Sequence, residues 1–244
     1  MARIEPFRAW RPDLGRVGPL SAAVSVPVPG IAPTGPWSAA HLLGENAGAT
    51  LREWLRDDIL VQDSARSLYV VEQDIPSEAF PFVQRGLLCR VGLEDGGSGG
   101  RFAPRLEEGR DPGRWLDLLR ATHWNVAPAL ANFPDDDGTV AALLERATGR
   151  ALPLETDDPR GGKCRLWAVS DSATVSALCG AVGAQPLEWL TPHLHDAALL
   201  YLAERDEPET SPARFVMALL VGATEPGPAR APLAGLAYHS LKGH

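Results

Sequence analysis

The sequence predicts an α/β or α+β fold in which helices flank a mixed β-sheet. Apolar runs of strand length alternate along the chain with segments whose apolar residues recur at helical spacing. No internal repeat interrupts this alternation, and apolar residues make up 45% of the 244 residues, enough for a sizeable core. We expect one domain over residues 1–244, with a possible subdivision near the glycine-rich residues 95–100.

The first part of the chain predicts a loop followed by a helix and two strands. Five prolines in residues 13–36 exclude a helix or a central strand there. Thr50 and Glu53 have the spacing of a capping box, which predicts a helix beginning at Thr50. In chain order we expect an extended segment at 3–10, the loop at 13–36, the helix from Thr50, and strands at 67–72 and 80–93, with Gly86 as a possible bulge.

The second part alternates helices and strands more regularly. Aspartates precede several of the predicted helices, as expected for N-terminal capping residues. We expect helices from Asp111-Pro112 to Thr122, from Asp135–Asp137 to Ala147, from Asp171 or Ser172 to Val182, and at His195–Ala203; extended segments at 126–132, 164–169, 186–190 and 235–239; and a strand or buried helix at 215–221.

The charge balance argues against nucleic acid and anionic membranes as partners. The chain has 23 basic and 31 acidic residues, a formal net charge of −8. The arginines are scattered and the lysines are only Lys163 and Lys242. Nucleic-acid binders normally carry a basic patch.

The cysteines and the N-terminus favour a cytoplasmic protein. Cys89, Cys164 and Cys179 lie far apart in apolar runs, which predicts buried thiols in a reducing compartment and no metal site. The first residues contain no apolar leader, and no apolar run approaches the ~20 residues that a membrane span needs.

The segment Trp189–Tyr201, W-L-T-P-H-L-H-D-A-A-L-L-Y, is the strongest candidate for a site. It places His193, His195 and Asp196 where a strand opens into a helix, whose free N–H groups attract anions. The segment has no glycine, arginine or lysine to hold a phosphate, and no third metal ligand lies nearby in sequence. The alternative is two surface or helix-cap histidines.

Other polar residues give weaker signals. The runs Glu107–Glu108 and Asp135–Asp137 precede helices and favour a capping or solvated role, and Glu72 ends a strand where it could act as a base. Trp37 and Trp124 flank irregular segments and are candidates for a pocket wall or partner surface. The common phosphate-binding, dinucleotide-binding, serine-hydrolase and zinc-protease motifs do not occur.

Eight segments, taken in order, carry a family resemblance. They are I-E-P-F-R-A-W-R-P (4–12), L-R-E-W-L-R-D-D-I-L-V-Q-D (51–63), S-L-Y-V-V-E-Q (67–73), R-G-L-L-C-R-V (85–91), R-W-L-D-L-L-R-A-T (114–122), V-A-P-A-L (126–130), A-A-L-L-Y-L-A-E-R-D-E (197–207) and R-F-V-M-A-L-L-V (214–221). In order and spacing the chain resembles the bacterial family known as domain of unknown function 1015, as a shortened member.

The polar motifs of that family are altered here. Members carry A-D-G-H-H-R before the helix that matches Ala197 onward, and this chain has L-T-P-H-L-H at 190–195. His193 matches, while Thr191, Pro192, Leu194 and His195 stand at the Asp, Gly, His and Arg of the motif. By position, the family's H-E, P-P-Y-D-V and P-T-H-R segments correspond to Arg105-Leu106, Val24–Val28 and Pro232–Gly235.

The resemblance implies an ancestral ATP-dependent activity. The family motif is similar to phosphate-handling motifs of ParB/sulfiredoxin-like proteins, so such an element is possible, and some relatives are associated with phosphorylating free serine. The altered positions remove a base or Mg²⁺ ligand and a charge clamp, and Pro192 removes a backbone N–H. We therefore expect a pseudoenzyme without a cofactor, in which His193, His195 and Asp196 are vestigial, that binds a small molecule or protein partner.

Two alternatives remain open. One is an active serine-like kinase or phosphohydrolase with a rearranged site that uses His193, His195, Asp196 and Glu72 with ATP and Mg²⁺. The other is a sub-module of a larger assembly.

Overall fold

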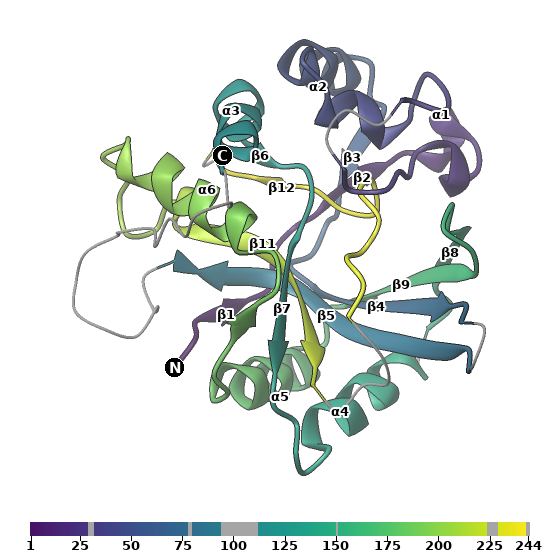
Figure 1. Ribbon diagram of the computed structural model, residues 1–244, viewed down its shortest axis with the longest axis vertical. Helices are drawn as coiled ribbons and strands as arrows, with labels where there is room; N and C mark the ends of the chain where they lie inside the picture. The colour runs from purple at the N-terminus through teal and green to yellow at the C-terminus, as the bar shows by residue number, and fades with distance from the viewer. Residues whose placement is uncertain (29–31, 78–79, 94–111, 150, 224–228, 243–244) are drawn as a thin grey trace.

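A central mixed sheet organises the chain. The computed structural model describes residues 1–28, 32–77, 80–93, 112–149, 151–223 and 229–242. Its eight-stranded sheet has the order β10-β7-β11-β5-β4-β9-β8, and β1 pairs with the end of β5 (Figure 1). The strands are β1 (Ile4–Glu5), β4 (Leu68–Ile75), β5 (Phe82–Gly92), β7 (Ala129–Phe133), β8 (Leu154–Asp157), β9 (Lys163–Val169), β10 (Glu188–Trp189) and β11 (Phe215–Gly222). This arrangement confirms the predicted α/β class with a mixed sheet.

Strand β11 explains why the sheet is mixed. It pairs antiparallel with β5 and parallel with β7, and every one of its residues is buried. A strand covered on both faces reads as a continuous apolar run instead of an alternating one. That is why the sequence alone left Phe215–Val221 open between a strand and a buried helix, and the structure resolves it as a strand.

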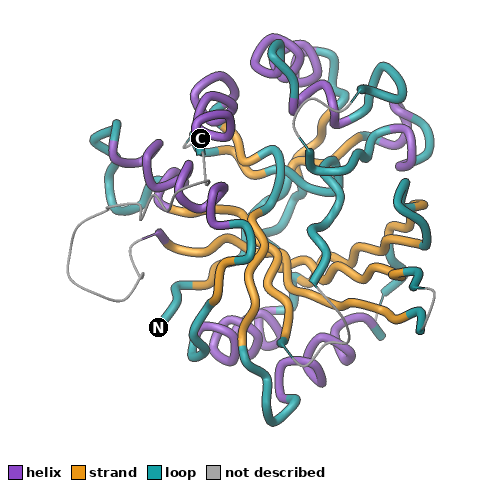
Figure 2. Tube along the Cα trace, in the orientation of Figure 1, coloured by secondary structure: helices purple, strands orange, loops and turns teal. Residues whose placement is uncertain are grey.

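Helices cover the sheet on both sides. The helices α4 and α5 lie below it in Figure 1, whereas α3 and α6 lie above it together with the N-terminal elements, as the tube in Figure 2 also shows. The bounds are α1 (Leu14–Val17), α2 (Ala47–Arg56), α3 (Gly113–Thr122), α4 (Thr139–Thr148), α5 (Ser172–Gly183) and α6 (Pro192–Ala203), with short 3₁₀ helices at Leu20–Ala22, Ala39–Leu43 and Pro212–Arg214.

Two small sheets complete the upper layer. The strands β2 (Trp10–Pro12) and β3 (Leu60–Gln62) form one, and β6 (Trp124–Asn125) and β12 (His239–Ser240) form the other. An isolated bridge between Trp10 and Tyr238 connects the first of these sheets to the C-terminal segment. The buried apolar side chains form a single cluster that runs from Ile4 to Leu241.

Several helix starts differ from the sequence-based expectation. The capping box at Thr50 is wrong, because α2 begins at Ala47 and Thr50 lies inside it. The segment 13–36 is also not loop throughout, because Asp13 accepts a hydrogen bond from Gly15 N and starts α1. The expected cap at Asp171 is confirmed by its hydrogen bond from Thr174 N (2.9 Å). Asp111 and the possible subdivision at 95–100 lie outside the described residues.

Gly86 does not form a bulge. It pairs in regular register with Val71 on β4 and Val221 on β11. A Cβ at this position would lie 2.9 Å from both Leu219 Cδ1 and Leu220 O. The glycine is required by the close packing of β5 against β11, not by a break in the ladder.

Two of the three cysteines are buried as expected, and the third is not. Cys89 and Cys164 are buried free thiols, and burial raises the pKa of each, whereas Cys179 is half-buried. Across the described ranges of the chain, no helix has the length and apolar character needed to cross a membrane.

Candidate functional site at the start of helix α6

The turn between β10 and α6 is fixed to the neighbouring strand by backbone contacts. Trp189 pairs with Ala131 on β7. Leu190 N and Thr191 N both donate to Leu130 O (2.8 and 3.2 Å), and Thr191 Oγ1 accepts from Leu130 N (2.7 Å). Thr191 immediately precedes α6, yet its hydroxyl accepts a hydrogen bond from β7 instead of capping the helix.

Helix α6 begins at Pro192, earlier than the predicted start at His195. Proline suits the first helical position because its fixed φ is helical and no N–H is needed there. His193, His195 and Asp196 consequently all lie on the helix, where residues two apart point in different directions.

His195 is held between a tryptophan and a carboxylate. Its ring stacks on Trp189 with centroids 4.4 Å apart and planes inclined at 29°. Its Nδ1 lies 3.6 Å from Oδ1 of the buried Asp196. Burial lowers the pKa of His195, and the attraction of Asp196 opposes that shift only in part. The imidazole is thus neutral near pH 7.

His193 faces a different neighbour. Its ring centroid lies 6.3 Å from that of Trp115 on α3, with planes inclined at 37°. The two histidines thus contact aromatic side chains from different elements and do not converge on one point. Within the described part of the chain, no group of three or more His, Cys, Asp or Glu side chains could hold a metal ion.

A very small cavity lies beside the start of α6. Its volume is about 10 Å³, room for about one water molecule. Leu194 lines it together with Trp115 and Trp124. Trp124 was one of the two tryptophans expected to form a pocket wall. The other, Trp37, packs against Trp54 at a centroid distance of 6.3 Å.

The segments at 24–28 and 232–235, which the resemblance matched to family motifs, lie against each other. Ser25 N donates to Ala234 O (3.0 Å), and Ala234 N donates to Ser25 O (2.9 Å). The next residue, Gly235, has φ +96°, and a Cβ there would lie 2.7 Å from Ala23 O. Val24, Leu233 and Ala234 are all buried. The pairing is a tight backbone contact with apolar surroundings.

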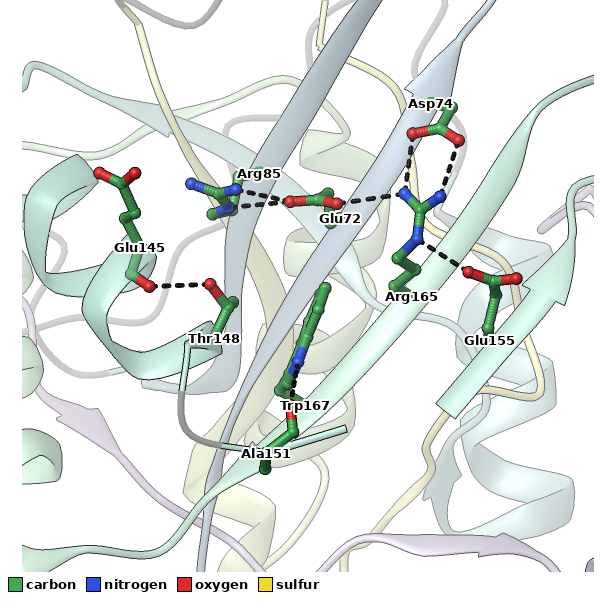
Figure 3. A network of polar contacts seen from close by, with 9 residues as sticks. All are labelled: Glu72, Asp74, Arg85, Glu145, Thr148, Ala151, Glu155, Arg165 and Trp167. Carbon is green, nitrogen blue, oxygen red and sulfur yellow. Dashed lines mark hydrogen bonds and ion pairs between the residues drawn. The ribbon is translucent and has the colours of Figure 1, made fainter. Parts of the chain in front are cut away.

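Glu72, the base of the alternative hypothesis, belongs to a different part of the molecule. Its carboxylate accepts from Arg85 Nη2 (2.6 Å) and Arg165 Nη1 (3.1 Å), while Arg165 also donates to Asp74 and Glu155 (Figure 3). Figure 3 shows this network beside α4, and α4 lies on the opposite side of the sheet from α6 in Figure 1. The structure does not bring Glu72 together with the histidines.

The acidic run before α4 is a helix cap. The buried carboxylate of Asp135 accepts from Val140 N (3.0 Å) and Ala141 N (2.9 Å), and Asp137 Oδ1 accepts from Thr139 N (3.0 Å). These contacts confirm the capping interpretation, and the backbone hydrogen bond from Thr139 lowers the pKa of Asp137. The runs Glu107–Glu108 and Arg105-Leu106 lie outside the described residues.

Sequence reasoning did not indicate a cleft at the far end of the sheet. A cleft of about 340 Å³ lies where the β4–β5 hairpin ends beside the turn between β8 and β9. We call it the hairpin cleft, and its lining residues are Asp74, Ile75, Pro76, Pro81, Phe82, Val83 and Gly162. The sequence signals were the prolines around the hairpin and the D-P-R-G-G turn at 158–162, which mark loops but not a cavity.

Comparison with known proteins gives a family but no characterised relative. No curated protein and no solved structure matches the chain. A family model described as "Protein of unknown function (DUF1015)" matches residues 28–233. That range covers most of the chain, including the sheet strands from β4 to β11 and the start of α6. The chain therefore belongs to the DUF1015 family.

Proposed function

We propose that this chain is a catalytically degenerate member of its family that acts by binding a small molecule or a protein partner. One observation carries the proposal: the residues at the family's polar motif are engaged in packing. The Thr191 hydroxyl holds the Leu130 backbone, Leu194 lines an apolar cavity, and His195 stacks on Trp189.

The requirements of phosphoryl transfer support the same reading. Catalysis of that reaction is mostly positioning and electrostatic stabilisation by cations, metal ions and backbone N–H groups. Pro192 cannot donate a backbone hydrogen bond at the start of α6. The neutral His195 stands where the family motif has a permanently charged arginine.

The small volume at the start of α6 also supports the loss of catalysis. The cavity that Leu194 lines holds about one water molecule, far less than a nucleotide needs. The segments at 24–28 and 232–235, which correspond to two further family motifs, contact each other through the Ser25–Ala234 backbone pair.

The test is a phosphate-transfer assay on the purified chain with ATP, Mg²⁺ and either serine or a panel of small amino acids. We expect no transfer above the rate without protein. The matched variants are His193→Ala and Leu190→Ala, which changes a partly exposed neighbour in the same turn. Robust turnover that is lost in His193→Ala and kept in Leu190→Ala would overturn the proposal in favour of an active serine-like kinase or phosphohydrolase.

A further inference from the structure

The hairpin cleft is far from the start of α6. The end of the β4–β5 hairpin and helix α6 lie on opposite sides of the molecule in Figure 1. At about 340 Å³, the cleft falls at the lower end of the range of about 300–1,000 Å³ that is typical of small-molecule sites. None of the residues considered at the α6 site lines it.

One wall of the cleft is a rigid turn. Gly161 and Gly162 both have positive φ (99° and 84°), and a Cβ on Gly162 would lie 2.3 Å from Asp74 O. The turn is closed by hydrogen bonds from Gly161 N to Asp158 O (2.8 Å) and from Asp158 N to Gly162 O (3.0 Å). These hydrogen bonds and the close approach of Gly162 to Asp74 hold the turn in one conformation, which lowers the ordering cost of binding a ligand beside it.

An ion pair between the partly exposed Arg160 and the buried Asp158 fixes the same turn. The Asp158 carboxylate is completely buried and accepts from Arg160 Nε (2.9 Å) and Nη2 (2.7 Å). Arg160 Nη1 also donates to Ala231 O (3.0 Å), which ties the turn to the C-terminal segment. These polar groups stabilise the wall.

The described part of the lining offers no free charge to a ligand. Among the described lining residues Asp74 is the one ionisable residue, and Arg165 donates to both of its carboxylate oxygens (2.9 and 3.2 Å; Figure 3). The other described side chains there are apolar, and Pro76 and Pro81 have no backbone N–H to offer. A charged ligand would lose hydration without gaining a partner.

We propose that the hairpin cleft binds a compact, uncharged aromatic molecule. A flat ring suits this set of side chains, because three of the lining residues (Pro76, Pro81 and Phe82) have apolar rings and a rigid ligand loses little conformational entropy. The inference names a ligand class for the binding role proposed above and so rests on that proposal.

The test is a titration of the full chain with indole, followed through backbone amide chemical shifts. We expect saturable binding that shifts the amides of Gly162 and Val83. The variant Val83→Glu places a charge in the cleft, and Val61→Glu on β3 is the matched control, since the two valines are similarly exposed (44% and 41%). Val83→Glu should weaken indole binding about tenfold or more, whereas Val61→Glu should leave it unchanged.

Charged analogues complete the experiment. Tryptamine and indole-3-acetate should bind more weakly than indole, because each would bring an uncompensated charge to the cleft. Absence of saturable shifts in the unaltered chain, shifts centred elsewhere, equal losses in both variants, or tighter binding of a charged analogue would each overturn the inference. The phosphate-transfer assay distinguishes the two proposals. If the chain transfers no phosphate and does not bind indole, only the inference about the cleft fails. If the chain transfers phosphate, the proposed function fails.

Discussion

The start of α6 and the hairpin cleft differ in their polar side chains and in their volume. The start of α6 has two histidines and an aspartate but a cavity of only about 10 Å³, whereas the hairpin cleft has about 340 Å³ but a lining that is mostly apolar. Reactive residue types attract attention in a sequence, yet binding also needs room for a ligand. In this chain the reactive side chains and the room for a ligand lie in different regions.

Removing Leu194 should give the largest effect, because it tests how tightly the start of α6 is packed. Leu194→Ala should lower the free energy of unfolding by about 2–5 kcal/mol, the range for a large-to-small change at a buried site. Urea unfolding of this variant beside Leu190→Ala, whose side chain is 39% exposed, measures the difference. Equal and small losses in both variants would mean that α6 is loosely packed, and the contrast between the two regions would fail.

A smaller effect tests the rigid wall of the hairpin cleft. Gly162→Ala should destabilise the chain by about 2 kcal/mol, because a left-handed conformation costs roughly 1–2 kcal/mol for a residue with a Cβ and the backbone of Asp74 must also move. The matched control is Gly180→Ala on α5, whose Cβ would meet nothing within 4 Å; it should stabilise by about 0.5–1 kcal/mol. Thermal unfolding of both variants checks the signs. A neutral or stabilising Gly162→Ala would show that the wall is not rigid.

The smallest effect concerns pH at the start of α6. Burial lowers the pKa of His195 in the folded chain, so the unfolded chain binds a proton there more readily. The stability that the neutral ring contributes should be present above the unfolded pKa of about 6.5 and should decrease as pH falls below it. Comparing unfolding free energies of the unaltered chain and His195→Gln between pH 8 and pH 5 tests this. A difference that is independent of pH, or that grows in favour of the histidine as pH falls, would contradict it.

The sequence predicted the fold better than the site, for physical reasons. Alternation and apolar runs identify strands such as Leu68–Ile75, and an aspartate before an apolar run identified the start of α5, because both signals are local. The start of α2 was missed because the helix begins at Ala47, after an Asn46 that makes no side-chain capping hydrogen bond, and the pairing partners of Phe215–Gly222 depend on residues far away in the chain.

The arrangement of the site was beyond sequence reasoning for a related cause. His193, His195 and Asp196 follow a strand as expected but lie within α6, and the Thr191–Leu130 contact and the Trp189–His195 stack arise only when β10 docks on β7. The described lining of the hairpin cleft comes from the ends of β4 and β5, with the prolines beside them, and from Gly162, which is distant in sequence. A cavity of that kind produces no periodic pattern of apolar residues in the sequence.

The pairing of Ser25 with Ala234 and of Trp10 with Tyr238 has a consequence for folding kinetics. These contacts join the early and late parts of the chain, so closing them costs more loop entropy than any hairpin of the central sheet. Folding rates fall as such distant contacts accumulate. During synthesis, the N-terminal elements would keep apolar surface exposed until the segment that contains Ala234 and Tyr238 had left the ribosome. We expect the chain to depend most on chaperones during that interval.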